Sequence, residues 1–412
     1  MSQGSSSQKQ AIIVGAGIVG LTQAWVLVKA GYSVTVLDRN SEPGEGTSKA
    51  NAGQLLYDRI GAMGSPGFLK ALPQTLKDPD NGVNISGLAH PAHWYWSINF
   101  LTQCTNRAWK RNTKALLQIA HRSREIMETV REEHDISFKW RKPGKIITHA
   151  TRSALQTADD ALQYHKQFGG RHDMISQEQC FELEPALQDT QMEIAGGIHL
   201  PDAQIGDCSM FCKEFAKLLA SEYDVKFRMN VNAYGLEKSK RRISAIATLE
   251  GPVSGDLFII ATGADDRRLL PFDFPGRKPV IGIKGLSLTF PVGQTPPDLS
   301  VTDSAGKFLV MRLGDQLRVT GFALFSRNAK PEQKYVDTLT AKARRLMPQA
   351  ALYETTPEIW MGSRPTTDDD VPMMGRAGAE NLYVNAGHGS LGWTLGFGAA
   401  DMLSKHIAKY QY

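Results

Sequence analysis

Three glycines near the N-terminus have the spacing of a dinucleotide-binding turn. Gly15, Gly17 and Gly20 follow the apolar run 11–14, which predicts a buried strand, and a helical stretch begins beside them. The first glycine permits a tight turn, the second lets the backbone approach a pyrophosphate, and the third lets the helix pack on the strand. The unpaired N–H groups and the dipole of that helix favour bound phosphates. The pattern therefore predicts a dinucleotide site.

An aspartate at the end of the next predicted strand limits the choice of dinucleotide. Asp38 follows the run 33–37 and lies 18 residues beyond Gly20. There its carboxylate can accept hydrogen bonds from a ribose 2′-hydroxyl, and its charge repels a 2′-phosphate. We therefore expect FAD or NAD, and not NADP.

Two further glycine-marked turns lie far along the chain. Residues 259–264 read as a buried strand that ends in small residues, where the backbone can pack beside an adenosine diphosphate. Residues 385–394 contain glycines that would let a loop lie against a large flat ring. Three distant turns around one sheet fit a long cofactor, and FAD is therefore favoured over NAD.

The remaining pattern predicts an α/β chain with β-rich insertions. Apolar residues at helical spacing predict a helix over 115–135, and Asp207 is placed to cap a second helix that begins at Cys208. A closing helix is expected over 397–410. Strands are expected at 145–148, 225–227, 242–250, 256–260 and 382–385, and an antiparallel sheet at 281–290 and 308–322.

The composition is that of a soluble globular protein. The 412 residues allow two or three domains, and 42% of them are hydrophobic and 22% charged. The start lacks the apolar core of a secretory signal and no apolar run is long enough to cross a membrane, so we expect a cytoplasmic protein. The net charge of +5 is too diffuse to indicate nucleic acid. Four cysteines without a CxxC pair favour reduced, buried thiols and no metal site; they are Cys104, Cys180, Cys208 and Cys212.

One segment is open to two interpretations. Residues 90–101 are rich in aromatic side chains, and Arg107, Lys110, Arg111 and Lys114 follow. Aromatic rings beside basic side chains suit a membrane interface. The same pattern fits a helix that packs its aromatic residues into a core and leaves a solvated basic face. We favour core packing and retain a peripheral contact with the inner face of a membrane as the alternative.

With these motifs the sequence resembles a known family, the D-amino-acid oxidase superfamily of FAD enzymes. Within that superfamily it is most similar to the bacterial D-amino-acid dehydrogenases of the small-subunit type, over about residues 10–408. The motifs that carry the resemblance are the N-terminal glycine pattern, 47–54, 196–202 with 206–208, 284–287, 360–367 and 385–394.

The resemblance implies an α/β fold with two interleaved domains. One is a glutathione-reductase-like FAD-binding domain, and the other is a smaller α+β substrate domain whose antiparallel sheet would cover the flavin. The implied FAD-binding domain comprises residues 10–85, 194–265 and 358–412, and the implied substrate domain comprises residues 86–193 and 266–357.

The resemblance also implies which residues would contact FAD. Segment 47–54 would line the pyrophosphate and the ring, and loop 388–394 would meet the pyrimidine side of the isoalloxazine. We expect noncovalent FAD, because no cysteine lies near that loop and no histidine lies within 47–54. The expected cofactor-binding residues are Gly15, Gly17, Gly20, Asp38, Arg39, Ser48, Asn51, Gly53, Gln54, Thr262, Gly263, Gly387, Gly389, Leu391, Gly392, Trp393 and Thr394.

The implied reaction is the oxidation of a D-amino acid at Cα by hydride transfer to flavin N5, which gives an imine that hydrolyses to a 2-oxo acid and ammonia. Such a reaction needs a neutral substrate amine and a firmly held carboxylate, but no protein nucleophile. Arg364 matches the family's carboxylate-binding arginine, and a guanidinium suits this role because its planar fork binds a carboxylate bidentately. Arg312 is a candidate second cation for the pocket, and His388 a candidate hydrogen-bond partner of the ring or the amine.

Several alternatives stay open. The donor could be a cyclic or N-alkyl amino acid such as hydroxyproline or sarcosine, and the electrons could pass to a quinone, a redox protein or O₂. A tRNA-modifying flavoprotein is more remote, because only 107–114 and 238–242 cluster basic residues. Arg364 could instead pair with a surface acid among 368–370.

The chain departs from the family pattern at two places. Residues 55–64 replace a Pro-Gly- and Trp-containing segment near the implied substrate entrance, and residues 367–370 replace the usual Thr-Pro-Asp-Gly. The first departure leaves the substrate side chain undetermined.

Overall fold

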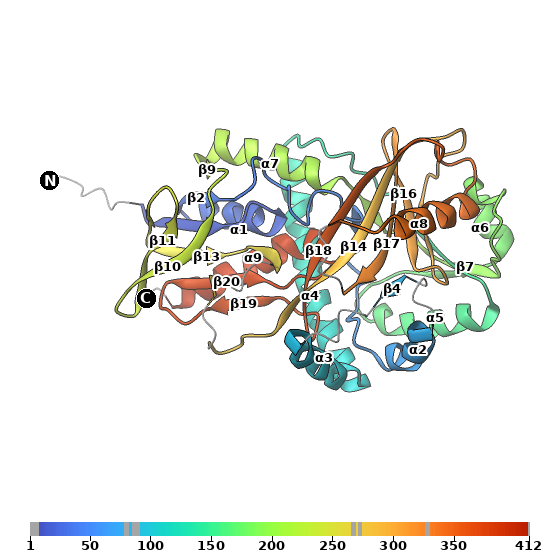
Figure 1. Ribbon diagram of the computed structural model, residues 1–412, viewed down its shortest axis with the longest axis horizontal. Helices are drawn as coiled ribbons and strands as arrows, with labels where there is room; N and C mark the ends of the chain where they lie inside the picture. The colour runs from blue at the N-terminus through green and yellow to red at the C-terminus, as the bar shows by residue number, and fades with distance from the viewer. Residues whose placement is uncertain are drawn as a thin grey trace.

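The computed structural model describes residues 8–77, 82–84, 91–264, 269–270, 274–325 and 330–410. It is a mixed α/β structure with one mainly parallel and one mainly antiparallel sheet, which confirms the predicted fold class at this level. The parallel sheet gathers elements from both ends of the chain at one end of the molecule, and the antiparallel sheet lies at the other (Figure 1).

The parallel sheet takes its strands from three distant parts of the chain. Their order is β19-β20-β13-β1-β2-β9, and all neighbours are parallel except β19 and β20. The central strands are short apolar runs without alternating polar residues, as expected for strands covered on both faces. The strands are β1 (Gln10–Val14), β2 (Ser33–Leu37), β9 (Lys226–Arg228), β13 (Leu257–Ile260), β19 (Met373–Arg376) and β20 (Leu382–Ala386).

Alternate side chains of this sheet enter two different cores. Ile13 and Ile259 belong to a core shared with four helices, whereas Ile12 and Phe258 on the other face pack against a small three-stranded sheet. The helices are α1 (Ile18–Lys29), α4 (Asn106–Glu133), α7 (Cys208–Tyr223) and α9 (Gly392–Lys409), and the small sheet consists of β10 (Ala233–Ser239), β11 (Arg242–Thr248) and β12 (Val253–Ser254).

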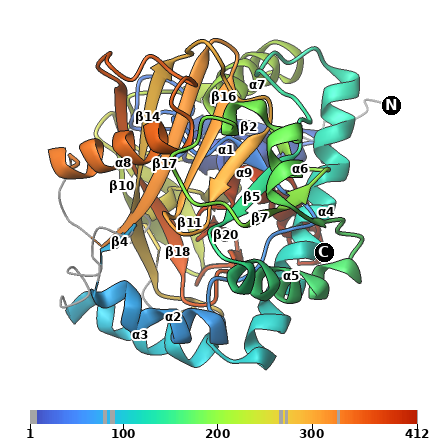
Figure 2. The same cartoon turned by 90° about the vertical axis from the view of Figure 1, so that its right-hand side faces the viewer.

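The antiparallel sheet lies at the opposite end of the molecule from the parallel sheet (Figure 1). Its order is β18-β14-β17-β16-β15-β5-β7-β6, with β4 paired to β17. Leu286, Leu288 and Val319 pack on one face under α8 (Gln333–Leu346) (Figure 2). The strands are β4 (Val83–Asn84), β5 (Lys145–His149), β6 (Asp173–Ile175), β7 (Gly196–Leu200), β14 (Val280–Pro291), β15 (Ser300–Asp303), β16 (Phe308–Leu313), β17 (Gln316–Leu324) and β18 (Glu358–Thr367).

Two helices lie at the edge of the larger sheet. They are α2 (Pro66–Lys77) and α3 (Pro91–Gln103), which are neighbours in both views (Figures 1 and 2). Trp96 and Phe100 of α3 stack on each other and belong to the same core as Ile281 and Ile283 of β14. The remaining elements are β3 (Gln54–Leu55), β8 (Gln204–Ile205), α5 (Arg152–Lys166), α6 (Gln177–Leu183) and a 3-10 helix, Pro185–Leu187.

The predicted elements are present, with some different ends and one split. Asp207 caps α7 as predicted, because its carboxylate accepts hydrogen bonds from the N–H groups of Ser209 and Met210. The predicted segment 308–322 is two strands, since Gly314 takes a φ of +65° in a turn between β16 and β17. Strands β7 and β18 fall within the ranges predicted for the FAD-binding domain but pair in the antiparallel sheet. The division into domains stays a prediction.

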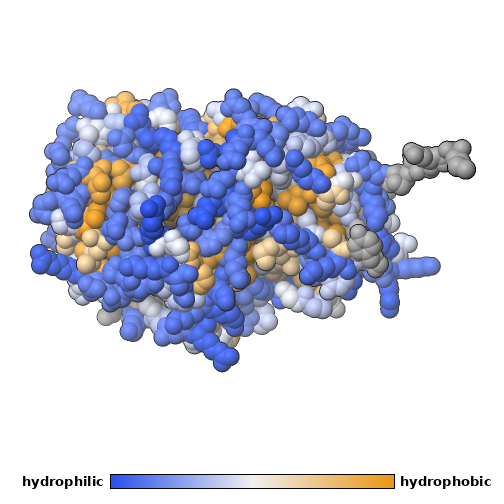
Figure 3. Space-filling view, turned by 180° about the vertical axis from the view of Figure 1, so that it is seen from behind, coloured by the Kyte–Doolittle hydropathy of each residue, from blue (hydrophilic) through white to orange (hydrophobic). Residues whose placement is uncertain are grey.

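The surface and the cysteines add three observations. All four cysteines are buried and free. No helix in the described part of the chain is both long and apolar enough to cross a membrane. The reverse face of the molecule is mainly hydrophilic, with small separate hydrophobic patches (Figure 3).

Candidate active site

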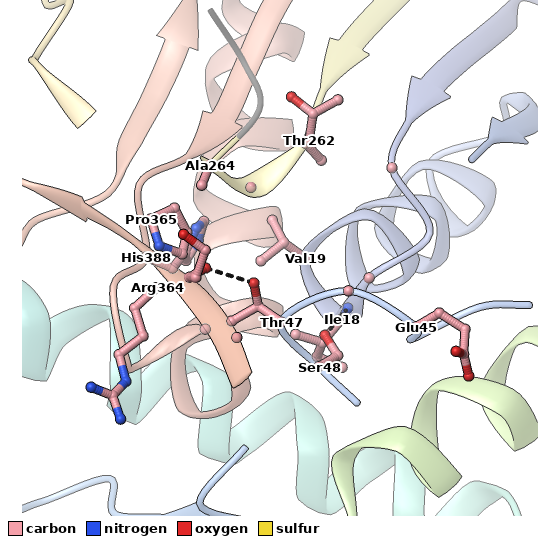
Figure 4. A pocket seen from close by; sticks show the side chains of 18 of the residues that line it. Ile18, Val19, Glu45, Thr47, Ser48, Thr262, Ala264, Arg364, Pro365 and His388 are labelled. Atoms are coloured by element: carbon pink, nitrogen blue, oxygen red, sulfur yellow. Dashed lines mark hydrogen bonds between the residues drawn. The ribbon is translucent and has the colours of Figure 1, made fainter. Parts of the chain in front are cut away.

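A cavity of about 690 Å³ lies between the two sheets. Eight separate parts of the chain line it, and several of their side chains point into it in Figure 4. Of the residues expected from the sequence, it brings together Gly15, Gly17, Asp38, Arg39, Ser48, Asn51, Thr262, Gly263, Arg364, Gly387, His388, Gly389, Gly392 and Trp393.

One end of the cavity is built by the turn between β1 and α1. Gly15 has a φ of +115°, which favours glycine, and a Cβ on Gly20 would lie 1.8 Å from the Gly15 carbonyl oxygen. Gly20 therefore packs the helix on the strand and does not line the cavity. Asp38 accepts a hydrogen bond from the Ala16 N–H at 2.6 Å and one from the Asn40 N–H at 2.8 Å. Its carboxylate is thus fixed at the carboxyl end of β2, beside the glycine turn.

The loop after β2 joins this end to the antiparallel sheet. The Ser48 hydroxyl accepts a hydrogen bond from the Ile18 N–H at 3.1 Å, at the start of α1. The neighbouring Thr47 donates its hydroxyl hydrogen to the Ser363 carbonyl of β18 at 2.8 Å (Figure 4). The segment 47–48 therefore ties the cofactor turn to the strand that carries Arg364.

The guanidinium of Arg364 lines the cavity and has no acidic partner among the described residues. Its Nη1 donates to the Phe322 carbonyl at 2.9 Å, and the group lies against Gly285, where a Cβ would be 2.2 Å away. Burial lowers the pKa of Arg364, but a guanidinium keeps its proton at neutral pH. The side chain extends away from Thr47 and His388 (Figure 4). Several N–H donors of a charged fork are therefore available to an anion.

Two of the three acids that follow Arg364 are engaged elsewhere. Asp369 pairs with the Lys278 ammonium at 2.8 Å, and Asp370 accepts a hydrogen bond from the Met63 N–H at 2.6 Å. The alternative interpretation, in which Arg364 pairs with a surface acid of 368–370, has no contact to support it in the described structure.

A strained residue sets the direction of the Phe322 carbonyl. Phe322 has a φ of +64°, rare for a residue with a side chain, at an irregularity where Lys284 pairs with Leu324 but Leu286 pairs with Gly321. Such strain collects at functional sites, because the surroundings must impose it. Nothing in the sequence distinguishes this phenylalanine from its neighbours in a strand, so it was missed.

His388 is a neutral, buried group at the cavity. Burial lowers its pKa to about 3, so the imidazole carries no charge at neutral pH. Its Nε2 has no hydrogen-bond partner in the described part of the chain. His388 can therefore donate or accept a hydrogen bond, according to its tautomer, but it cannot act as a cation.

The structure does not bring Arg312 to the cavity. Its Nε donates to the Gly314 carbonyl at 2.8 Å, and its Nη1 lies 3.9 Å from Asp298, in the turn at the far end of β16. The other expected residues that do not line the cavity are Gly20, Gly53, Gln54, Leu391 and Thr394.

The antiparallel sheet also supplies residues that the sequence analysis missed. Ser287 and Thr320 lie opposite each other on β14 and β17 and both line the cavity, where Ser287 donates to the Ala50 carbonyl at 2.5 Å. Alternation along a strand shows which side chains share a face, but not what that face covers.

Comparison with known proteins assigns the chain to a class. Residues 10–406 match the model of the DAO family, described as FAD dependent oxidoreductases, and the chain belongs to this family. The members of this family are enzymes that depend on FAD.

Individual relatives span nearly the whole chain. The chain is 32% identical over 406 residues to "D-amino acid dehydrogenase" of Vibrio vulnificus (strain CMCP6), covering 98% of this chain and 96% of that protein. It is 34% identical over 403 residues to "D-amino acid dehydrogenase" of Paramagnetospirillum magneticum, covering 96% and 94%. Among solved structures, it resembles glycine oxidase from Bacillus cereus ATCC 14579 with a TM-score of 0.73 at 17% identity, covering 98% of this chain and 96% of that chain. It resembles L-proline dehydrogenase from P. horikoshii with a TM-score of 0.72 at 18% identity, covering 98% and 94%.

The residues present fit FAD. Several buried polar atoms that line the cavity have no hydrogen-bond partner in the described structure. A bound cofactor could supply these hydrogen bonds. The atoms belong to Thr262, Asn385, His388 and Trp393. At the other end, the glycine turn and Asp38 offer the arrangement that a pyrophosphate and a ribose require.

Proposed function

We propose that this enzyme oxidises D-amino acids at Cα to imines, which water hydrolyses to 2-oxo acids and ammonia. The observation that carries the proposal is the Arg364 guanidinium, which lines the cavity without an acidic partner in the described structure. A charged fork in this environment suits the carboxylate of a small zwitterion. The names of the relatives in Vibrio and Paramagnetospirillum support the same substrate class.

The roles of the chain's own residues follow from this arrangement. Arg364 would hold the substrate carboxylate and so fix which face of Cα is presented. His388, kept neutral by burial, would hydrogen-bond the ring or the amine without adding a positive charge that opposes loss of hydride from the substrate. FAD, when bound, accepts the hydride. The proposed flavin contacts are those expected from the sequence, and they include Gly53, Gln54, Leu391 and Thr394, which do not line the cavity.

A cyclic or N-alkyl amino acid is the second candidate donor. The likeness to glycine oxidase and L-proline dehydrogenase shows the fold alone, but the carboxylate that Arg364 would hold is common to all these substrates.

Anaerobic bleaching of the flavin separates the candidates. The purified holoenzyme is mixed without oxygen with D-amino acids, L-amino acids, sarcosine and hydroxyproline, and the oxidised flavin absorbance is followed. Rapid bleaching by D-amino acids is expected. Bleaching by sarcosine or hydroxyproline alone would select the second candidate, and no bleaching by any of them would refute both.

We further propose that electrons leave to a quinone at a membrane that the enzyme contacts peripherally. The aromatic segment does not simply pack inward, since Trp94, Tyr95 and Ile98 of α3 are 56%, 67% and 63% exposed. Arg107 and Lys110, at the start of α4, are also exposed. Interfacial rings beside cations suit an anionic lipid surface.

Vesicle co-sedimentation tests this contact. The wild type is expected to sediment with vesicles containing phosphatidylglycerol at low salt, and the double variant Trp94→Ser, Tyr95→Ser is expected not to. Tyr234→Ser is the matched control, because Tyr234 is 51% exposed but lies on β10. Equal sedimentation of all three proteins would refute a contact through α3.

A further inference from the structure

The two segments where this chain departs from the family pattern meet in the structure. Asp370 stands where the family's Thr-Pro-Asp-Gly has glycine, and its carboxylate accepts hydrogen bonds from the N–H groups of Met63 and Gly64. The distance from the Met63 nitrogen to Oδ2 of Asp370 is 2.6 Å. Met63 and Gly64 end the other departing segment, 55–64, and lead directly into α2.

Residues 61–77 and 91–103 form a unit that we call the α2–α3 lobe. Phe68 of α2 meets Phe100 of α3 edge to face with ring centroids 5.1 Å apart, and Phe100 stacks on Trp96 at 4.9 Å. The Trp96 indole N–H donates to the Thr366 carbonyl at 3.1 Å. The lobe is therefore attached to the chain 364–370 at two points, Thr366 and Asp370.

The lobe packs on one end of the sheet face from which Arg364 projects, at Ile281 and Ile283. Arg364 pairs with Ile283, and Thr366 pairs with Ile281, across the antiparallel strands β18 and β14. Directly paired residues project from the same face of a sheet. Because Ile281 and Ile283 share a core with Trp96 of the lobe, a carboxylate held by Arg364 would lie beside the lobe.

The backbone of Asp370 is held in a conformation that favours glycine. Its φ is +63°, and the turn is fixed from both sides, since the Lys278 ammonium and the Thr367 hydroxyl both donate to the Val371 carbonyl. Glycine adopts this conformation without strain, and aspartate tolerates it better than most other residues. Local geometry alone therefore favours glycine over aspartate at this position. The contact of Asp370 with the lobe accounts for the aspartate.

We propose that Asp370 is a positioning residue that fastens the α2–α3 lobe to the strand of Arg364 and so determines how the substrate fits beside this arginine. This inference rests on the proposed amino-acid substrate. Asp370 acts through the lobe and does not itself touch the reacting atoms.

The charges around Asp370 define how its contact responds to pH. Asp368 and Asp369 lie on its own turn, Asp369 is paired with Lys278, and Cys104 faces it from the junction of α3 and α4. Burial outweighs the two N–H bonds and raises the pKa of Asp370 to about 6. Asp370 therefore binds a proton more tightly when the lobe is attached than when it is detached, and the attachment weakens as the pH rises from about 4 to about 6.

The test compares Asp370→Gly and Asp370→Asn with the wild-type holoenzyme. Asp224→Gly is the matched control, because Asp224 is also an aspartate with positive φ, at +52°, but it ends α7 and is exposed. Hydrogen-exchange protection of the lobe is measured together with KM and kcat. We expect Asp370→Gly to lose about tenfold or more of the protection over 61–68 and to raise KM about fivefold or more, with kcat within about twofold.

The other variants complete the test. Asp370→Asn keeps an oxygen acceptor, so it should restore most of the protection. It should also abolish the rise of KM that the wild type is expected to show as the pH rises from about 4 to about 6. Asp224→Gly should match the wild type in both readouts. Unchanged protection in Asp370→Gly would overturn the attachment, and lost protection with an unchanged KM would overturn the role in substrate fit. If no amino acid bleaches the wild-type flavin, the proposed function fails, whereas the exchange result still decides the attachment.

Discussion

At the scale of single residues, the site combines a guanidinium that has no opposite charge beside it in the described structure with a histidine that burial keeps neutral. Among the described residues the Arg364 guanidinium donates to the neutral Phe322 carbonyl and meets no acid, and the imidazole of His388 is held neutral. Arg364 is only partly exposed, and a partly buried cation without a counter-ion is costly unless a ligand supplies the opposite charge. This cost supports the proposal that Arg364 serves a bound carboxylate and not the stability of the fold.

Replacing Arg364 should therefore damage catalysis more than folding. Arg364→Leu would leave the substrate carboxylate desolvated and without a partner, at a cost of about 2–5 kcal/mol. This corresponds to a loss of roughly 30-fold to a few thousand-fold in kcat/KM. Steady-state kinetics with the substrate found by bleaching measures it, and Arg312→Leu is the control, because Arg312 bonds outside the cavity. A loss below about threefold in Arg364→Leu would reject the role.

A second buried cation predicts a pH dependence of stability. Lys145 on β5 is 7% exposed, its ammonium donates to the Gln54 amide oxygen at 2.7 Å, and burial lowers its pKa from 10.5 to about 8. Between these values the unfolded chain binds the proton more tightly, so stability should rise with pH, by at most about 3 kcal/mol. Urea unfolding at pH 7.5 and pH 10 measures the rise.

Lys145→Gln separates this effect from other titrations. The variant keeps an N–H donor for Gln54 but loses the charge, so its stability should rise less between the two pH values. Tyrosines and cysteines titrate equally in both proteins and cancel in the comparison. The same slope in both proteins would show that Lys145 does not titrate as its burial implies.

At the scale of elements, local sequence signals predicted where a helix or turn lies better than they predicted where it begins and ends. The glycine turn and the Asp207 cap depend on hydrogen bonds and dihedral angles within a few residues, and both are where the sequence placed them. The closing helix begins at Gly392 and not near 397, because packing against other helices overrides the low helical propensity of Gly396 and Gly398. The irregularity at Phe322 has no sequence signal, since its conformation is imposed by tertiary contacts.

The glycines of the closing helix make a prediction about packing. A Cβ on Gly398 would lie 2.0 Å from the Ile119 carbonyl oxygen and 2.9 Å from the Ser123 nitrogen, both on the backbone of α4. Gly398→Ala must therefore separate two helix backbones, and overpacking of this kind costs about 1–3 kcal/mol or more. The midpoint of urea unfolding should fall. Gly375→Ala in β19, where a Cβ meets no atom within 4 Å, should leave it unchanged.

At the scale of the whole molecule, the cavity is a product of topology. Gly15 and Trp393 both line it although they are far apart in the chain, because β1 and β20 belong to one sheet and α9 packs on that sheet. The sequence predicted those parts of the cavity wall that carry glycine motifs, because such turns indicate that the backbone closely approaches a ligand. It did not predict Ser287 and Thr320, because their role depends on which layer faces their strands.

Because the cavity joins both sheets, binding of FAD should stabilise the molecule as a whole. Protein freed of flavin is expected to unfold at a lower temperature, and FAD at 100-fold its Kd should add about 2.7 kcal/mol. Adenosine diphosphate can occupy only the end of the cavity at Gly15 and Asp38, so it should stabilise the protein less than FAD does. If the flavin is bound noncovalently, acid precipitation should release all of it. Thermal melts of the freed protein with each ligand measure the stabilisation. Equal stabilisation by adenosine diphosphate and FAD would mean that the residues around Arg364 and His388 do not hold the flavin ring.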